Sequence, residues 1–218
     1  MIEFSEVSSV IRAGRTLQRI FGSLTMRLPT DRRLAILVKS TDVRQELVQL
    51  ICGSKEPTTG LIERRVRVSY PVGFSSGFYP KLTVLGNIGF VAALFGLDRR
   101  SFIELVVPLL GDDPQLDTSL ADLPQTFRAN LAYCISYAVP FDVYVANNVL
   151  MPSNQALRSR LSPLLDARLE TSGLILVTAM APIAQAVCQE GAVLHREELT
   201  LFPSVKAAVS FFREIEEV

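Results

Sequence analysis

The sequence predicts an α/β fold in which helices cover both faces of a mostly parallel sheet. Short apolar runs at residues 34–38, 141–146 and 174–178 are typical of buried strands, and a helical pattern follows each of them. Strands that alternate with helices in this way favour parallel pairing. The chain has 218 residues, of which 49% are hydrophobic, so it is long enough for one such domain.

The first third of the chain is organised around residues 33–53. We expect an antiparallel N-terminal layer, built from alternating strands at 2–7 and 24–28, to supply the antiparallel edge of the sheet. A buried strand, a turn at residues 39–41 and a helix from Asp42 to about Cys52 follow, with Gly53 as the C-cap. Residues 61–70 are strand-like, and residues 71–81 form a loop rich in glycine and proline.

The remaining elements are mostly helical. Helices are expected at residues 82–95, 101–110 and 122–138, and residues 82–138 are predicted to form a helical subdomain between the two parts of the α/β core, within a single domain 1–218. Beyond it we expect a strand at 141–146, a helix at 155–171, a strand at 174–178, a short helix ending near 189, a hairpin across 192–201 and a helix at 205–217.

The turn between the central strand and its helix has the geometry of a phosphate-binding loop. The first N–H groups of a helix lack intrahelical partners and attract anions. The glycines and the lysine of such a loop are missing here. The sequence therefore predicts a nucleotide-binding architecture without the residues that hold a nucleotide.

Composition excludes several classes of protein. The 22 basic and 22 acidic residues are interspersed, which disfavours a nucleic-acid binder. We expect a cytoplasmic protein, because the sequence has neither a signal-peptide pattern nor an apolar run of ~20 residues. The three cysteines lack zinc-site spacing and are interpreted as core residues, so no metal is expected.

A family resemblance rests on landmarks around the predicted loop and the second strand. They are Tyr70-Pro71-Val72-Gly73, Gly77-Phe78, Leu82-Thr83, Asn87 and Phe141-Asp142. On these residues the chain resembles, nearly end to end, the ATPase subunit of ABC transporters, and most closely the subfamily for capsular-polysaccharide export. The resemblance implies a P-loop-NTPase-like fold of the ABC-ATPase type.

The same resemblance implies that the ATP-site positions are degenerate. The phosphate loop matches residues 38–46, where Val38 and Val43 oppose wrapping of a phosphate, Arg44 matches the lysine and Gln45 matches the hydroxyl that holds magnesium. The remaining positions of the site, in family order, match Ile11 (adenine-stacking aromatic), Tyr79 (metal-sensing glutamine), Pro124-Gln125-Thr126 (signature), Asn147 and Asn148 (the two carboxylates) and Ala179 (switch histidine). No ATP, magnesium or other cofactor is therefore expected.

Two helix starts that face the phosphates in the family carry Asp-x-x-Gln. We hypothesise that Asp42 with Gln45, and Asp122 with Gln125, cap their own helices and occupy the phosphate donors. Chance recurrence of common helix-start residues is the competing explanation. Asp42 and Glu46 are also expected to add negative charge where the triphosphate would sit.

Other candidate chemistry is weak. His195, the only histidine, is interpreted as a surface or edge residue because no nucleophile accompanies it at a recognisable spacing. Asp112-Asp113, between a glycine and a proline, is interpreted as turn chemistry.

The sequence therefore predicts a catalytically inactive ABC-ATPase-like protein, a scaffold or regulator in polysaccharide export or surface-glycan biosynthesis. A partner, either a membrane subunit, an ABC-ATPase-like protein or a second copy, is expected at Phe78, Tyr79, Pro80 and Lys81, at the inner face of the membrane. One alternative is an energy-coupling ATPase of a polysaccharide exporter with an atypical ATP site. Another is a module that binds a different ligand between Arg44 and Arg128.

Overall fold

The computed structural model describes residues 1–13 and 16–215 and confirms the α/β fold with a mostly parallel sheet. The described residues divide into two compact units. Unit 1 takes its residues from Met1–Pro71, Phe141–Leu150 and Thr171–Val218, and unit 2 comprises Val72–Pro140 and Met151–Glu170. The two units are described separately below.

Unit 1 contains a six-stranded sheet of order β5-β6-β7-β3-β8-β9. Neighbouring strands pair in parallel except β8 and β9, which form an antiparallel hairpin. The antiparallel edge thus comes from the C-terminal hairpin, and the prediction that the N-terminal strands supply it is wrong. The strands are β3 (Arg33–Leu37), β5 (Val68–Pro71), β6 (Val143–Asn147), β7 (Gly173–Thr178), β8 (Glu190–His195) and β9 (Glu198–Phe202).

The N-terminal strands form a separate antiparallel sheet of order β2-β1-β4. It contains β1 (Ile2–Ala13), β2 (Thr16–Leu28) and β4 (Thr59–Arg64). The first two strands are longer than the sequence analysis predicted. The prediction stopped short because register shifts along the pairing of β1 with β2 interrupt the alternation of apolar residues by which a strand is recognised in a sequence. The strand-like stretch 61–70 is divided between two sheets, since β4 pairs with β1 and β5 pairs with β6.

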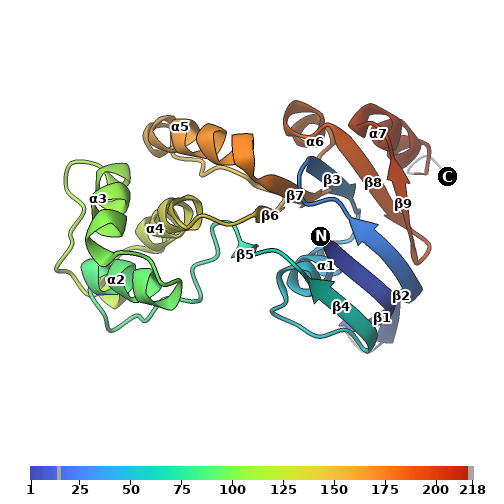
Figure 1. Cartoon of the computed structure of the whole chain (residues 1–218), viewed down its shortest axis with the longest axis horizontal. Coiled ribbons are helices and arrows are strands. Elements are labelled where there is room, and N and C mark those ends of the chain that lie inside the picture. The colour runs from blue at the N-terminus through green and yellow to red at the C-terminus, as the bar shows by residue number, and fades with distance from the viewer. Residues whose placement is uncertain (14–15, 216–218) are drawn as a thin grey trace. The chain divides into compact units, whose positions relative to one another are not determined.

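Helix α1 (Thr41–Cys52) lies between the two sheets of unit 1 (Figure 1). Alternate residues of the parallel strands, among them Leu34, Ile36 and Val145, join one hydrophobic core with α1 and the N-terminal sheet. Helix α6 (Ala181–Val187) contacts β3 and β7 of the sheet, and helix α7 (Val205–Glu214) contacts β3, β8 and β9. The end of the predicted C-terminal helix, residues 216 and 217, lies outside the described residues.

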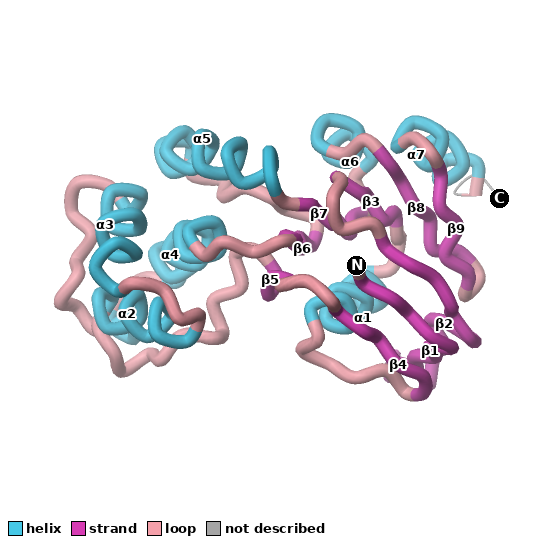
Figure 2. Tube along the Cα trace, in the orientation of Figure 1, coloured by secondary structure: helices cyan, strands magenta, loops and turns pink. Residues whose placement is uncertain are grey.

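Unit 2 is helical (Figure 2), with α2 (Val84–Leu94), α3 (Arg99–Leu110), a short 3-10 turn η1 (Leu120–Asp122), α4 (Gln125–Ala138) and most of α5 (Gln155–Thr171). Arg168 of α5 donates to the carbonyls of Tyr137 and Ala138 at 2.9 and 2.7 Å. The last carbonyls of a helix need donors from outside the usual intrahelical pattern, and the arginine supplies them here and ties α5 to α4.

Candidate functional site

The loop after β3 is closed by Ser40, which is the N-cap of α1. Its Oγ accepts from the N–H of Val43 at 3.4 Å. Asp42 lies inside the first helical turn with an exposed side chain, so the hypothesis that Asp42 and Gln45 form a capping box is wrong. The cap falls on serine because Ser40 is the last residue with an extended backbone, at ψ 130°. Gly53 ends the helix with φ 75°, as predicted.

The second capping hypothesis is also wrong. Asp122 ends the η1 turn, and α4 begins at Gln125 after Pro124, whose backbone is extended and which has no side-chain cap. A helix start of this kind leaves its first N–H groups without a carboxylate from Asp122. The two Asp-x-x-Gln sequences therefore recur without a common role.

Arg44 folds back onto the loop that precedes its own helix. Nη1 donates to the carbonyls of Val38 and Lys39 at 2.9 and 2.6 Å, and Nη2 donates to Thr41 Oγ1 at 2.9 Å. The residue is only 6% exposed, and its Nε is buried without a partner. Acceptors of the loop itself thus hold the guanidinium, and it is not available to an anion.

Glu46 does not face the loop. It is 4% exposed, accepts from Ser9 Oγ of β1 at 2.9 Å and pairs with Lys55 at 2.6 Å. The expectation that Glu46 adds negative charge to the phosphate position is therefore wrong. Two residues further along the helix than Arg44, its side chain is rotated away and ties α1 to the N-terminal sheet.

The end of β6 is latched to the end of β7 by Asn148. Its backbone has φ 60°, and its Oδ1 accepts from Thr178 Oγ1 at 3.0 Å and from the N–H of Ala179 at 3.3 Å. The Thr178 hydroxyl oxygen in turn accepts from the N–H of Met180 at 2.9 Å. The amide of Asn148 thus serves the protein's own backbone, beside Asn147 at the end of β6.

Ile11, the predicted counterpart of the adenine-stacking aromatic, is 8% exposed and belongs to the core of unit 1.

The loop before α2 in unit 2 contains the predicted partner-binding residues. The buried Asn87 accepts a hydrogen bond from the Tyr79 N–H at 2.8 Å and donates to the carbonyls of Tyr79, Leu82 and Thr83. One amide therefore fixes the course of residues 79–83.

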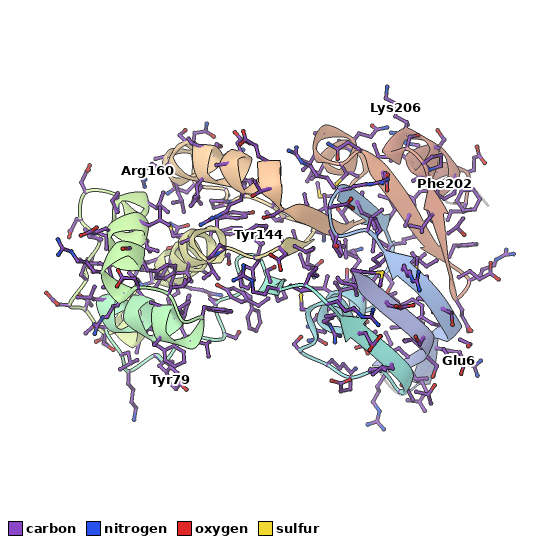
Figure 3. All side chains as sticks on the ribbon, viewed as in Figure 1. Glu6, Tyr79, Tyr144, Arg160, Phe202 and Lys206 are labelled. Atoms are coloured by element: carbon purple, nitrogen blue, oxygen red, sulfur yellow. The ribbon has the colours of Figure 1, made fainter. Side chains whose placement is uncertain are left out.

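The side chains of that loop are largely open to solvent. Tyr79, which is labelled in Figure 3, is 54% exposed. Its ring also packs edge-on against that of Phe90, with the ring centroids 4.7 Å apart. Pro80 and Lys81 are exposed and Phe78 is half-buried. Leu82, 41% exposed, extends the same surface.

Sequence reasoning missed a cavity of about 430 Å³ in unit 1, beside the loop after β3. Its walls come from β2, from residues 38–43 and from the turn of the β8–β9 hairpin, including His195. The only histidine of the chain therefore lines a cavity. Its position in a predicted hairpin gave no indication of this.

The remaining site chemistry is sparse. Burial raises the pKa of the thiols to about 12 at Cys52, Cys134 and Cys188, which makes all three poor nucleophiles at neutral pH. Within residues 1–13 and 16–215 no cluster of metal-ligating side chains is found. In that same part of the chain, no helix has the length and apolar character needed to cross a membrane.

Comparison with solved structures identifies the class of fold. The chain aligns over 98% of its length, with a TM-score of 0.75 and 14% identity, to 99% of an ATP-binding subunit of an ABC transporter. It aligns with a TM-score of 0.71 and 12% identity over 91% of its length to 96% of the ATP-binding cassette MJ0796, solved as a dimer bound to ADP and phosphate. The fold is therefore that of an ABC ATPase subunit.

Sequence relatives confirm the resemblance seen in the sequence. The chain is 22% identical, over 99% of its length and 100% of the relative's, to the capsule polysaccharide export ATP-binding protein CtrD of Neisseria meningitidis. It is 23% identical to ATP-binding protein BexA of Haemophilus influenzae, over 98% of the chain and 99% of the relative. Identity is also 23% to the polysialic acid transport ATP-binding protein KpsT of Escherichia coli, again over 98% and 99%. No family model matches the chain.

Proposed function

We propose that this protein is an ABC-ATPase-like subunit that has lost ATP hydrolysis and acts as a scaffold or regulator in polysaccharide export or surface-glycan biosynthesis. The setting is carried over from the capsule and polysialic acid proteins to which the chain is similar. The loss of hydrolysis rests on one observation. The guanidinium of Arg44 is bound to the carbonyls of the loop in which a phosphate would lie.

Several of the groups that a triphosphate requires are missing from this loop or already bonded within the chain. A phosphate loop offers free backbone N–H groups, a lysine and a hydroxyl for magnesium. Here the N–H of Val43 is directed at Ser40, and the cation at position 44 is committed to three acceptors of the chain. Releasing the guanidinium would remove this donor from the carbonyl of the buried Val38 and from that of Lys39. The residues present therefore do not fit a triphosphate in this loop.

The residues at the end of β6, where the family carries two carboxylates, do not fit magnesium either. Magnesium prefers carboxylate oxygens, and an activated water needs a base. Asn147 and Asn148 carry no charge, and the amide oxygen of Asn148 already accepts two hydrogen bonds. These residues can hold the strand ends together, but they cannot take a proton from water at neutral pH.

The alternative is an energy-coupling ATPase subunit with an atypical ATP site. The names of the relatives, all ATP-binding proteins, favour it. Isothermal titration of the full chain with ATP and magnesium separates the two functions. We expect no saturable heat up to millimolar ATP. Binding in the micromolar range that disappears when magnesium is chelated would overturn the loss of ATP chemistry and establish the alternative.

We also propose that the surface of Phe78, Tyr79, Pro80 and Lys81 receives a protein partner at the inner face of the membrane. Two observations support it. Aromatic and apolar side chains are exposed there, and Asn87 holds the backbone beneath Tyr79 in one conformation. Such preorganisation lowers the entropy lost on binding. The partner is a membrane subunit, an ABC-ATPase-like protein or a second copy of the chain, since the MJ0796 cassette is a dimer in its structures.

That surface is tested by co-purification from the native host. Tyr79→Lys removes an exposed aromatic without touching Asn87, whose bonds go to the backbone of the loop. We expect the bound partner to be lost with Tyr79→Lys and retained with the control Leu105→Lys, which changes a 38% exposed apolar residue on α3. Equal recovery of the partner with both variants would exclude this surface.

A further inference from the structure

Strand β9 is the last strand at one end of the six-stranded sheet of unit 1 (Figure 1). Its register with β8 is continuous from Phe202, opposite Gly191, to Glu198, opposite His195. Proteins commonly protect such an edge strand against further pairing with a lysine, a proline or a bulge. The five residues of β9 include none of these, so the strand is an open template for another strand.

The register of the hairpin decides which backbone groups of β9 point outward. Opposite residues of an antiparallel pair alternate between those that exchange both hydrogen bonds and those that exchange none. A two-residue turn with φ 47° and 69° joins β8 to β9, and the residues that flank such a turn, His195 and Glu198, exchange both bonds. Every second residue of β9 from Glu198 onward is therefore bonded to β8. The N–H and C=O groups of Leu199 and Leu201 point to the free edge.

The free edge of β9 is open to solvent beyond the turn. In the described ranges 1–13 and 16–215, no other segment donates to or accepts from the backbone of Leu199 and Leu201. Strand β2 approaches the hairpin at its turn, where Arg19 Nη1 lies 3.9 Å from Glu197 Oε2. Further along the strand Thr200 is exposed, and Leu201 is 46% exposed. The outward N–H and C=O groups are therefore within reach of a second strand.

The sequence of β9 is complementary to itself in one antiparallel register. When two copies of the strand pair about a two-fold axis beside Thr200, Leu199 of each copy stands opposite Leu201 of the other. These are the residues with outward backbone groups, so this register forms four N–H···O bonds, whereas an axis beside either leucine forms only two within the strand. Thr200 meets its own copy, and threonine pairs are favourable across strands. The one charged residue, Glu198, stands opposite Phe202, so the two carboxylates are kept apart.

We propose that the free edge of β9 is an interface with a second copy of this chain, in which two β9 strands pair antiparallel about Thr200 and join two six-stranded sheets. The same surface serves on both copies, as a two-fold axis requires. Main-chain bonds and few side chains form the interface, so its area is small and the dimer is weak and concentration-dependent. The interface uses neither the loop after β3 nor residues 78–81, so it does not rest on the proposed function.

Cysteine crosslinking tests the register. The variant Thr200→Cys places two thiols at a pair without mutual hydrogen bonds, where the Cα atoms are about 4.5 Å apart and a disulfide fits. The matched control is Glu198→Cys on the same strand, whose two thiols lie four residues out of register, roughly 13 Å apart along the strand. Burial raises the pKa of the native thiols to about 12, so they compete little with the introduced ones at Cys52, Cys134 and Cys188.

Both variants of the full chain are oxidised with copper phenanthroline and analysed on non-reducing gels. We expect the disulfide-linked dimer to form at least about fivefold faster with Thr200→Cys than with Glu198→Cys, because only the first pair meets the geometry of a disulfide. The difference should disappear in 8 M urea, where the strands no longer pair.

Sedimentation velocity over a concentration series measures the association without crosslinking. The average mass should rise from 24.0 kDa toward twice this value as the wild-type concentration increases. Leu201→Pro removes an outward N–H and keeps the bonds to β8, since proline is tolerated in an edge strand where its N–H would face solvent. We expect this variant to remain monomeric over the series, with an unchanged far-UV circular dichroism spectrum. The control Tyr79→Lys, which changes the surface of unit 2, should dimerise as the wild type does.

Three results would overturn the proposal: equal rates of crosslinking in the two cysteine variants, a wild-type mass that stays at 24.0 kDa over the whole series, or a folded Leu201→Pro variant that dimerises as tightly as the wild type. The crosslinking test does not require Leu201→Pro to fold. None of these measurements uses ATP or a partner from the host, so this proposal and the proposed function can fail separately.

Discussion

Replacing Arg44 with methionine tests whether the folded-back guanidinium holds the loop after β3. Methionine keeps an unbranched apolar stem in the buried position but removes all donors. Three bonds are lost, to Val38 O at 2.9 Å, Lys39 O at 2.6 Å and Thr41 Oγ1 at 2.9 Å. Hydrogen bonds from a charged group stabilise by about 1.5 kcal/mol each at the lower end of their range.

One term acts in the opposite direction. The Nε of Arg44 is buried without a partner, and methionine removes that penalty of about 1 to 2 kcal/mol. Three bonds less this penalty leave a net destabilisation of about 3 kcal/mol. This is large for a residue outside the apolar core, and it comes from the loop that the guanidinium closes.

The assay is urea unfolding of the full chain, followed by far-UV circular dichroism because the sequence has no tryptophan. The matched control is Arg65→Met, since Arg65 belongs to the same unit and pairs with Glu63 at 3.0 Å with side chains 63% and 44% exposed. We expect the control to change the free energy of unfolding by less than about 0.5 kcal/mol. If Arg44→Met changes it no more than the control does, the argument from the three bonds is refuted.

Further predictions concern the latch, the loop of unit 2 and the thiols. Asn148→Asp should change the free energy of unfolding by under about 0.5 kcal/mol, because a carboxylate still accepts from both donors. Asn148→Ala should lower it by about 2 kcal/mol, because both bonds are lost and alanine is strained at a φ of 60°. Urea unfolding of both variants measures the difference. Asn87→Leu should make the backbone near Tyr79 susceptible to limited proteolysis by trypsin at Lys81, while wild-type protein resists under the same conditions. Burial raises the thiol pKa to about 12, so native protein at pH 8 should react with Ellman's reagent far more slowly than protein in 8 M urea at Cys52, Cys134 and Cys188. Because the unfolded thiols lose their protons first, the free energy of unfolding should also fall as pH rises above about 9. Rapid labelling of native protein, or stability that rises over that pH range, would contradict the burial.

The sequence could predict most of the parallel core, because its strands are short apolar runs bounded by turn residues. The strand at 174–178, for example, was found within one residue of β7 (Gly173–Thr178). The N-terminal sheet was predicted with the right type and the wrong lengths. Its register shifts remove the alternation on which strand prediction depends.

The site was less predictable than the fold. The absence of glycine from residues 38–46 and the presence of an arginine at position 44 are visible in the sequence, because they concern residue types. The partners of a buried polar side chain are not visible in this way. Glu46 meets Ser9, which is 37 residues earlier, and only the rotation of α1 between the two sheets brings them together.

The sequence by itself determined the fold class and the residue types present in the loop after β3, because apolar periodicity and residue type are local properties. Only the tertiary structure decided where those residues are directed. Arg44 turns toward its own loop, Asn148 holds the backbone of β7, and the cavity joins Arg19 to Arg196 across 177 residues of sequence. Contacts between distant segments depend on strand order and helix rotation, and neither is written in a short stretch of chain.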